Sequence, residues 1–197
     1  MLNIAVFVSG GGTNLQALMD AEKHGAIKNG KITLVVSSSE TAYALKRAEK
    51  EGIKTAVVSR KAFENSASFD HALLQTVKEN NIDLIVLAGF MSILGMGIIM
   101  EYKNKIINVH PSLIPSFCGK GYYGLKVHEA ALDYGVRITG ATVHFVNEIP
   151  DGGKIILQKA VEIIDGDTPE TLQKRVMEQA EWVILPRAVS LFCEGKL

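Results

Sequence analysis

The sequence predicts one α/β domain of Rossmann-like type, in which helices cover both faces of a mostly parallel central sheet. Short apolar runs rich in β-branched residues alternate with amphipathic segments along the first half of the chain. These runs are continuously apolar, which is typical of strands buried on both faces of a sheet. With 197 residues and 47% hydrophobic content, the chain can bury one sizeable core.

The first half of the chain predicts five strands and four helices in alternation. The expected strands are Ile4–Val8, Ile32–Val36, Thr55–Val58, Leu84–Leu87 and Ile106–Val109. The expected helices are Asn14–Glu22, Tyr43–Glu51, Ser68–Asn80 and the shorter Gly97–Tyr102. Gly52 and Ser68 are typical residues for ending one helix and beginning the next.

The pattern changes after Gly135. Two strand-like runs, Ile138–Val146 and Lys154–Val161, follow one another with only a turn between them, which predicts an antiparallel addition to the sheet. Thr168 and Pro169 then provide a cap and a first-turn proline for a long closing helix. We expect this helix to reach about Cys193 and to bend near Pro186.

The composition excludes several classes of partner. Lys and Arg total 21 and Asp and Glu total 21, so neither nucleic acid nor a membrane surface is an expected partner, and small molecules are favoured. The two cysteines, Cys118 and Cys193, fit a reducing compartment without disulfides. The first apolar run is too short for a signal peptide, and none elsewhere reaches membrane-spanning length. We therefore expect a cytoplasmic location.

A glycine-rich segment, Ser9–Asn14, follows the first predicted strand. Three glycines allow close approach of the backbone to a ligand, and the free N–H groups of a helix start suit an anion such as phosphate. Leu15 stands where the dinucleotide fingerprint needs glycine, and the Lys-Ser/Thr pair of a Walker loop is missing. An ordinary tight turn between strand and helix remains the alternative.

Asn108 and His110 end a predicted strand two residues apart, so their side chains project to the same side. Ligands of open parallel sheets bind beyond the carboxyl ends of the strands. Together with Asp151 in a distant Asp-Gly-Gly turn, these residues could stabilise an oxyanion and move a proton, which indicates acyl transfer. A structural histidine is one alternative. A metal site that also uses His128 and His144 is another, but the spacing is not typical of ligands, and no metal is expected.

Five segments in family order resemble the phosphoribosylglycinamide formyltransferases, also called glycinamide ribonucleotide transformylases, which are folate-dependent formyltransferases. The segments are Ser9-Gly-Gly-Gly-Thr-Asn-Leu-Gln16, Leu87-Ala-Gly-Phe-Met-Ser-Ile-Leu94, Ile107-Asn-Val-His-Pro-Ser-Leu-Ile-Pro115, Thr142-Val-His-Phe145 and Asp151-Gly-Gly-Lys-Ile-Ile-Leu-Gln158. The third is shared with other folate-dependent formyltransferases, including the methionyl-tRNA enzyme, which usually carries a further C-terminal domain.

The resemblance implies formyl transfer from 10-formyltetrahydrofolate to the amine of N1-(5-phospho-D-ribosyl)glycinamide, in de novo purine biosynthesis and without a metal. It implies a ribonucleotide site formed by Gly11, Gly12, Thr13, Asn14, Glu178 and Glu181. It implies a folate site formed by Met91, Ser92, Ile93, Leu94, Asn108, Asn147, Glu148, Ile149, Pro150 and Asp151. It implies a catalytic trio of Asn108, His110 and Asp151. From their chemistry we expect Asn108 to donate to the oxyanion, protonated His110 to stabilise it and act as the acid, and Asp151 to raise the histidine pKa.

The resemblance also implies that residues 1–197 form a single formyltransferase domain. A phosphate-binding half would cover about 1–100, and a catalytic and folate-binding half about 85–197. Whether the chain is a monomer or a homodimer stays open.

The sequence departs from the family pattern at several positions. Ser66 and Ser92 stand where some members carry arginine, which affects contacts to the anionic folate tail. Lys154 replaces a common proline, and the closing helix carries one extra residue before Pro186. The glycine-rich segment 116–124 fits either a mobile lid or a plain surface loop.

Two other functions remain open. A formyltetrahydrofolate hydrolase would use the same trio with water as acceptor, although such enzymes usually carry an N-terminal regulatory domain. A ligand-binding protein without activity is the second, and the presence of the whole trio argues against it.

Overall fold

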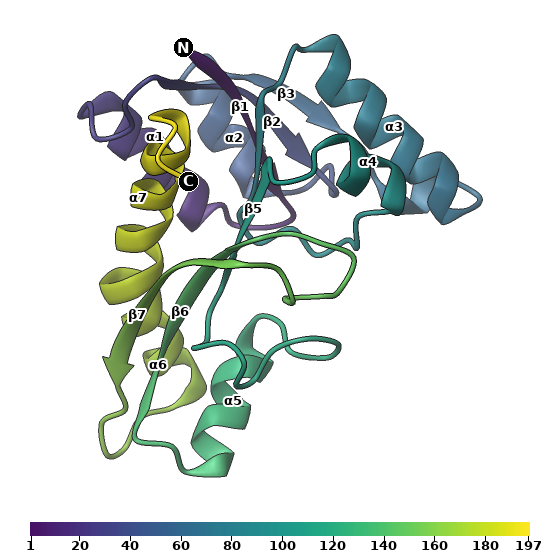
Figure 1. Ribbon diagram of the computed structural model, residues 1–197. Helices are drawn as coiled ribbons and strands as arrows, with labels where there is room; N and C mark the ends of the chain where they lie inside the picture. The colour runs from purple at the N-terminus through teal and green to yellow at the C-terminus, as the bar shows by residue number, and fades with distance from the viewer.

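The computed structural model describes all 197 residues, and a seven-stranded sheet runs through its centre in the order β3-β2-β1-β4-β5-β6-β7 (Figure 1). The strands are β1 (Leu2–Val8), β2 (Gly30–Ser37), β3 (Lys54–Val57), β4 (Leu84–Leu87), β5 (Ile106–His110), β6 (Ile138–Phe145) and β7 (Ile155–Glu162). The first five pair in parallel, whereas β6 is antiparallel to both β5 and β7. The predicted mostly parallel sheet with an antiparallel C-terminal addition is confirmed.

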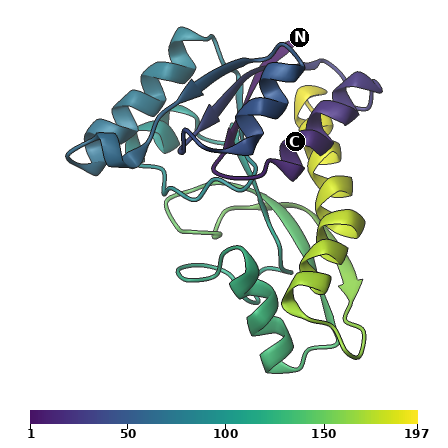
Figure 2. The same cartoon turned by 180° about the vertical axis from the view of Figure 1, so that it is seen from behind.

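Helices cover both faces of this sheet (Figures 1 and 2). They are α1 (Thr13–Lys23), α2 (Tyr43–Lys50), α3 (Ser66–Glu79), α4 (Met96–Glu101), α5 (Leu125–Tyr134), α6 (Pro169–Val176) and α7 (Trp182–Cys193), with a short 3-10 turn at Arg60–Ala62. Successive residues of β1 enter different core clusters, because strand side chains alternate between faces. Val6 packs with α1 and α7, and Phe7 packs with α3 and α4.

Helix α5 is absent from the sequence-based expectations. It follows a glycine-rich segment, and its first cap is Gly124 at a positive φ of 55°, so the usual Ser, Thr, Asp or Asn start signal is missing. Only three of its residues, Val127, His128 and Ala131, are buried. Such a short apolar stripe is weak in a sequence, and packing against the C-terminal part of the fold stabilises the helix.

The closing helix is irregular at a different place from the one expected. A five-residue π-helical turn, Met177–Glu181, separates α6 from α7, and Pro186 lies within α7. The bend near Pro186 stays a prediction, whereas the π-helical turn was not expected. Buried residues recur every four positions along this segment, at Leu172, Val176, Ala180, Ile184 and Ala188. Because this interval exceeds the 3.6-residue period of an α-helix, a wider turn keeps these side chains on one face and accommodates the extra residue.

Strand β1 lies between β2 and β4, so the strand order reverses beside it. Ligands of open α/β sheets bind at this switch point, beyond the carboxyl ends of the strands. The glycine-rich loop leaves β1 there, and the segment that leaves β4 lies next to it. The backbone N–H of Met91 donates to the Ser9 hydroxyl at 2.8 Å, which joins these two segments.

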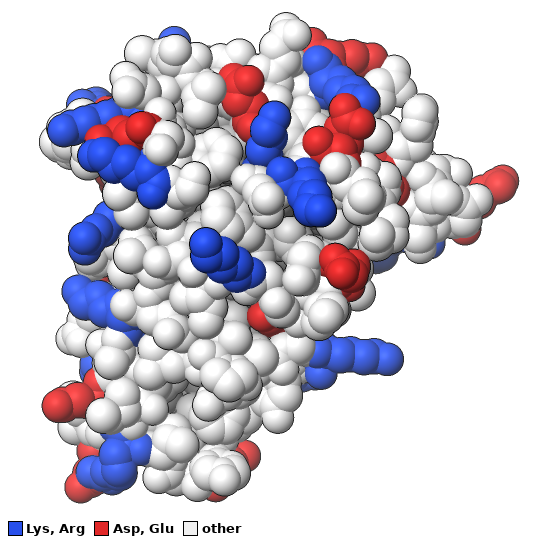
Figure 3. Space-filling model, in the orientation of Figure 1, with Lys and Arg blue, Asp and Glu red and all other residues white.

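The surface carries charges of both signs, and Figure 3 shows lysine or arginine and aspartate or glutamate on the same face. None of the helices combines the length and apolar character needed to cross a membrane.

Candidate active site

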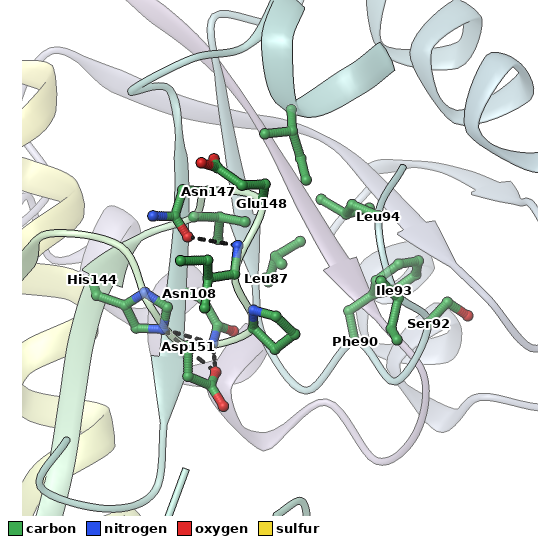
Figure 4. Close-up of a pocket in the computed structure, with 14 residues that line it drawn as sticks. Leu87, Phe90, Ser92, Ile93, Leu94, Asn108, His144, Asn147, Glu148 and Asp151 are labelled. Atoms are coloured by element: carbon green, nitrogen blue, oxygen red, sulfur yellow. Dashed lines mark hydrogen bonds and ion pairs between the residues drawn. The ribbon is translucent and has the colours of Figure 1, made fainter. Parts of the chain in front are cut away.

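Strands β5 and β6 place four polar side chains at one end of the sheet. In the antiparallel register, Asn108 pairs with His144, and His110 pairs with Thr142. Residues two apart on a strand share a face, so two side chains from each strand meet. The connection from β6 to β7 brings Asp151 against them, and Figure 4 shows Asn108, His144 and Asp151 converging.

The Asp151 carboxylate lies close to Asn108, His110 and His144, and it also contacts the loop that contains Gly119. Its Oδ2 accepts the backbone N–H of Gly119 at 2.8 Å and lies 3.5 Å from His110 Nδ1. Its Oδ1 lies 3.7 Å from His144 Nε2 and accepts from Asn108 Nδ2 at 3.4 Å. Burial raises the pKa of this carboxyl, but the two histidines and the Gly119 amide lower it more, so its pKa lies below the ordinary value. Asp151 is therefore ionised at neutral pH.

His110 is almost fully buried, with 5% of its surface exposed. Its Nε2 donates to the Phe117 carbonyl at 2.8 Å, and its Nδ1 faces Asp151. Burial lowers the histidine pKa, the Asp151 carboxylate and the Phe117 carbonyl oppose this, and the net shift is downward. The expected upward influence of Asp151 is present but smaller than the influence of burial, so the resting imidazole is neutral at pH 7, and not protonated as expected from the sequence.

His144 orients the Asn108 amide, a role that was not predicted from the sequence. There, His144 was considered only as a possible metal ligand. Its Nδ1 donates to the Phe145 carbonyl at 2.8 Å, which leaves Nε2 to accept from Asn108 Nδ2 at 3.1 Å. His144 therefore fixes the direction of the Asn108 amide. Side chains two residues apart on a strand share a face, so Thr142 and His144 could have been predicted to lie on one face of their strand. No group of three His, Cys, Asp or Glu side chains is placed to hold a metal ion.

A cavity of about 160 Å³ opens beside Asn108 and Asp151. Two segments face each other across it, one following β4 and one following β6 (Figure 4). All the residues of the expected folate site line it except Met91. Leu87, Phe90, Ile99, His144 and Val146 line it as well, although none of them was predicted. His110 does not line the cavity, and its Nδ1 lies 3.5 Å from Asp151 Oδ2.

The glycine-rich loop and the closing helix meet at a second site. Gly12 has a positive φ of 72° and caps the start of α1. The N–H groups of Gly11 and Gly12 donate to no other protein group. Asn14 Nδ2 donates to Glu181 Oε2 at 2.6 Å, and the Asn14 Oδ1 is buried without a partner. These groups leave donors and an acceptor free for a phosphorylated, hydroxylated ligand.

The two glutamates expected at this second site lie in different environments. Glu181 is 6% exposed, and burial, partly offset by the bond from Asn14, raises its pKa to about 7. Glu178 is exposed and lies 3.9 Å from Lys174, one helical turn away. The structure thus brings Glu181 to the site and leaves Glu178 in solvent.

The loop 116–124 contacts the trio directly, through the Phe117 carbonyl and the Gly119 N–H. Cys118 in the same loop donates its thiol to the Pro115 carbonyl. Burial and the nearby Asp151 raise the pKa of this thiol, which disfavours a nucleophilic thiolate.

Comparison with known proteins gives consistent results. The family model described as formyl transferase matches residues 2–189. Phosphoribosylglycinamide formyltransferase of Haemophilus influenzae is 43% identical over 197 residues, covering 100% of this chain and 90% of that protein. The Escherichia coli protein of the same name is 39% identical over 196 residues, with coverages of 100% and 89%.

Longer proteins match as well. The trifunctional purine biosynthetic protein adenosine-3 of Bos taurus is 44% identical over 98% of this chain, but the chain spans only 18% of that protein. Among solved structures, glycinamide ribonucleotide transformylase 1 from Symbiobacterium toebii superposes with a TM-score of 0.93 at 39% identity, covering 99% of this chain and 89% of that one.

Proposed function

The chain belongs to the formyl transferase family, and from that premise we propose that it transfers a formyl group from 10-formyltetrahydrofolate to the amine of N1-(5-phospho-D-ribosyl)glycinamide, a reaction of de novo purine biosynthesis. One observation carries this proposal: Asn108 and Asp151 line a partly apolar cavity, and His110 lies 3.5 Å from Asp151. An anion-suited glycine loop lies next to that cavity at the switch point of the sheet.

The cavity suits the folate. Leu87, Leu94 and Val146 provide apolar surface for a flat heteroaromatic ring, and the backbone of Asn147–Asp151 provides polar groups along one wall. The glycine loop and the start of α1 suit the phosphate of the ribonucleotide. The formyl carbon and the attacking amine would then meet between the two sites.

The trio supports the following sequence of bond changes. The neutral amine attacks the formyl carbon, the new C–N bond forms, and the carbonyl electrons move to oxygen. Asn108 Nδ2 keeps one hydrogen on His144, and its other hydrogen, which Asp151 accepts at 3.4 Å in the structure, turns to donate to this oxyanion. Neutral His110, whose Nε2 already donates to Phe117, takes at Nδ1 the proton that the amine loses. The electrons on the oxyanion then re-form the carbonyl, the bond from carbon to N10 breaks, and the proton passes from His110 to N10.

Asp151 supports this proton transfer through charge. Its ionised carboxylate, 3.5 Å from His110 Nδ1, stabilises the imidazolium that forms between the two steps. It also accepts from the Asn108 amide, so one carboxylate holds both catalytic partners in place.

The reaction is tested with purified protein and 10-formyltetrahydrofolate, by following release of tetrahydrofolate with and without the ribonucleotide. Release that requires the ribonucleotide supports the proposal. Release without it would instead support a formyltetrahydrofolate hydrolase, and no release in either case would support a binding protein.

Residues 1–197 act as one formyltransferase domain in the cytoplasm, with small molecules as partners, either as a monomer of 21.4 kDa or as a homodimer. Sedimentation of the purified protein separates these two states. A nucleic acid or a membrane that retains the protein at physiological salt would contradict the choice of partners.

A further inference from the structure

Helix α2 holds the carbonyl groups of the glycine-rich loop. The Ala44 N–H donates to the Gly10 carbonyl at 3.1 Å, and Arg47 Nε donates to the Gly11 carbonyl at 2.9 Å. In a planar trans peptide, the carbonyl and the N–H of the following residue point in opposite directions. The N–H groups of Gly11 and Gly12 therefore both point away from α2, which makes a concave arrangement of donors suited to an anion.

Arg47 has no negatively charged partner. Its Nη1 donates to the Gln16 side-chain oxygen at 3.0 Å, and its guanidinium lies 5.0 Å from the centre of the Tyr43 ring. No carboxylate lies within ion-pair distance of it, whereas Arg175 is paired with Asp167. The nearest carboxylate in this network is that of Asp20, which Arg47 reaches only through Gln16. The Arg47 charge therefore has no direct ion-pair partner, and it lies behind the free N–H groups, where it favours a bound anion.

The loop rests directly on α2. A Cβ added at Gly12 would lie 2.6 Å from the Ala44 Cβ and 3.5 Å from Arg47 Cδ. The Arg47 guanidinium bridges Gly11 to Gln16 of α1 through two donors in a fixed fork. A lysine carries a single point charge on a flexible stem, so it could supply the charge but not the same bridge.

We propose that Arg47 is a positioning residue for the phosphate of the ribonucleotide: it orients the Gly11–Gly12 amides towards the phosphate and supplies a positive charge behind them that no carboxylate pairs with directly. This rests on the proposed function and deepens it, because it makes Arg47 the basis for selecting a phosphorylated over an unphosphorylated acceptor.

Three variants test the proposal. Arg47→Met removes the charge and both donors, Arg47→Lys keeps the charge, and Lys46→Met removes an equal charge from the exposed neighbouring position of the same helix. The KM and kcat are measured for the ribonucleotide, for the same compound without its phosphate, and for 10-formyltetrahydrofolate.

The Met variant should raise the KM for the ribonucleotide on the order of tenfold, with kcat and the folate KM close to those of the unmodified protein. It should leave the KM for the unphosphorylated compound nearly unchanged. The ratio of kcat/KM for the ribonucleotide to kcat/KM for the unphosphorylated compound should therefore fall. Arg47→Lys should lie between, and Lys46→Met should match the unmodified protein. Equal losses for both acceptors, or no change in either, would overturn the proposal.

A second measurement does not depend on catalysis. Inorganic phosphate is titrated into the protein while the amide NMR signals of Gly11 and Gly12 are followed. Both signals should shift in the unmodified protein and respond only at much higher phosphate in Arg47→Met. Equal phosphate affinity in the two proteins would refute the role of Arg47. If these shifts occur but the protein transfers no formyl group, the role of Arg47 stands and the proposed function fails.

Discussion

Asn14, at the start of α1, donates a hydrogen bond of 2.6 Å to the carboxylate of Glu181, which lies 167 residues later in the closing helix. The pair joins the first and the last parts of the chain, and α7 lies beside α1 in both ribbon views. Because both side chains are more than nine-tenths buried, the bond forms in a site from which water is largely excluded.

Stability should depend on pH through Glu181. Burial raises its pKa from 4.5 to about 7 in the folded protein, so the folded state binds more protons than the unfolded state between these values. The free energy of unfolding should therefore fall, on the order of 3 kcal/mol, as the pH rises from about 4.5 to about 7. Urea unfolding across this pH range should show that Glu181→Gln lacks this fall in the free energy of unfolding. Identical pH slopes in the two proteins would contradict it.

Loss of the Asn108 amide should damage the chemical step. Asn108→Ala should lower kcat by about 10²- to 10³-fold, because a donor to the developing oxyanion is removed. Asn147→Ala is the matched control, since Asn147 lines the same cavity and its side chain hydrogen-bonds only with the nearby Ile149 backbone. We expect that control to keep kcat within severalfold. Near-normal turnover by Asn108→Ala would remove this residue from the mechanism.

His144 should act through Asn108. His144→Ala should lower kcat by about tenfold, because the Asn108 amide loses the acceptor that orients it. The double variant Asn108→Ala/His144→Ala should be no slower than Asn108→Ala alone, since one function is removed twice. Steady-state kinetics of the unmodified protein, the two single variants and the double variant gives the coupling energy between Asn108 and His144. Fully additive losses would mean that His144 acts independently.

The pH profile of kcat/KM should report His110. Because burial holds its pKa below 6.5, activity should fall on the acid side only below that pH, as the base form is lost. Asp151→Asn should lower kcat and move this limb to a still lower pH, since the carboxylate that opposes the burial effect is gone. An acid limb that moves to higher pH in Asp151→Asn would show that Asp151 does not raise the pKa of His110.

Gly12 should tolerate a side chain poorly, and Gly11 should tolerate one well. A Cβ at Gly12 would clash with Ala44 at 2.6 Å and would occupy a φ of 72°, whereas a Cβ at Gly11 meets nothing within 4 Å. Thermal unfolding should show a loss of about 1–3 kcal/mol for Gly12→Ala and almost none for Gly11→Ala. Similar losses in both would mean that the loop does not rest on α2 as described.

Local patterns in the sequence were sufficient for much of the sheet and for two of the three residues in the trio. Continuous apolar runs such as Leu84–Leu87 marked buried strands, because burial on both faces leaves no polar position. The period of two along a strand was enough to place Asn108 and His110 on one side of the sheet. Turn and cap residues, such as Pro169 at the start of α6, act within a few residues and were equally readable.

Only the tertiary structure decided which distant groups meet. The contact of Glu181 with Asn14 depends on a π-helical turn, and that turn depends on how the whole helix packs. The role of Arg47 depends on α2 lying against the loop that follows β1, and the low pKa of His110 depends on its burial by other segments. Periodicity and turn chemistry are set by neighbours along the chain, whereas burial and long-range contacts arise from packing summed over all of it.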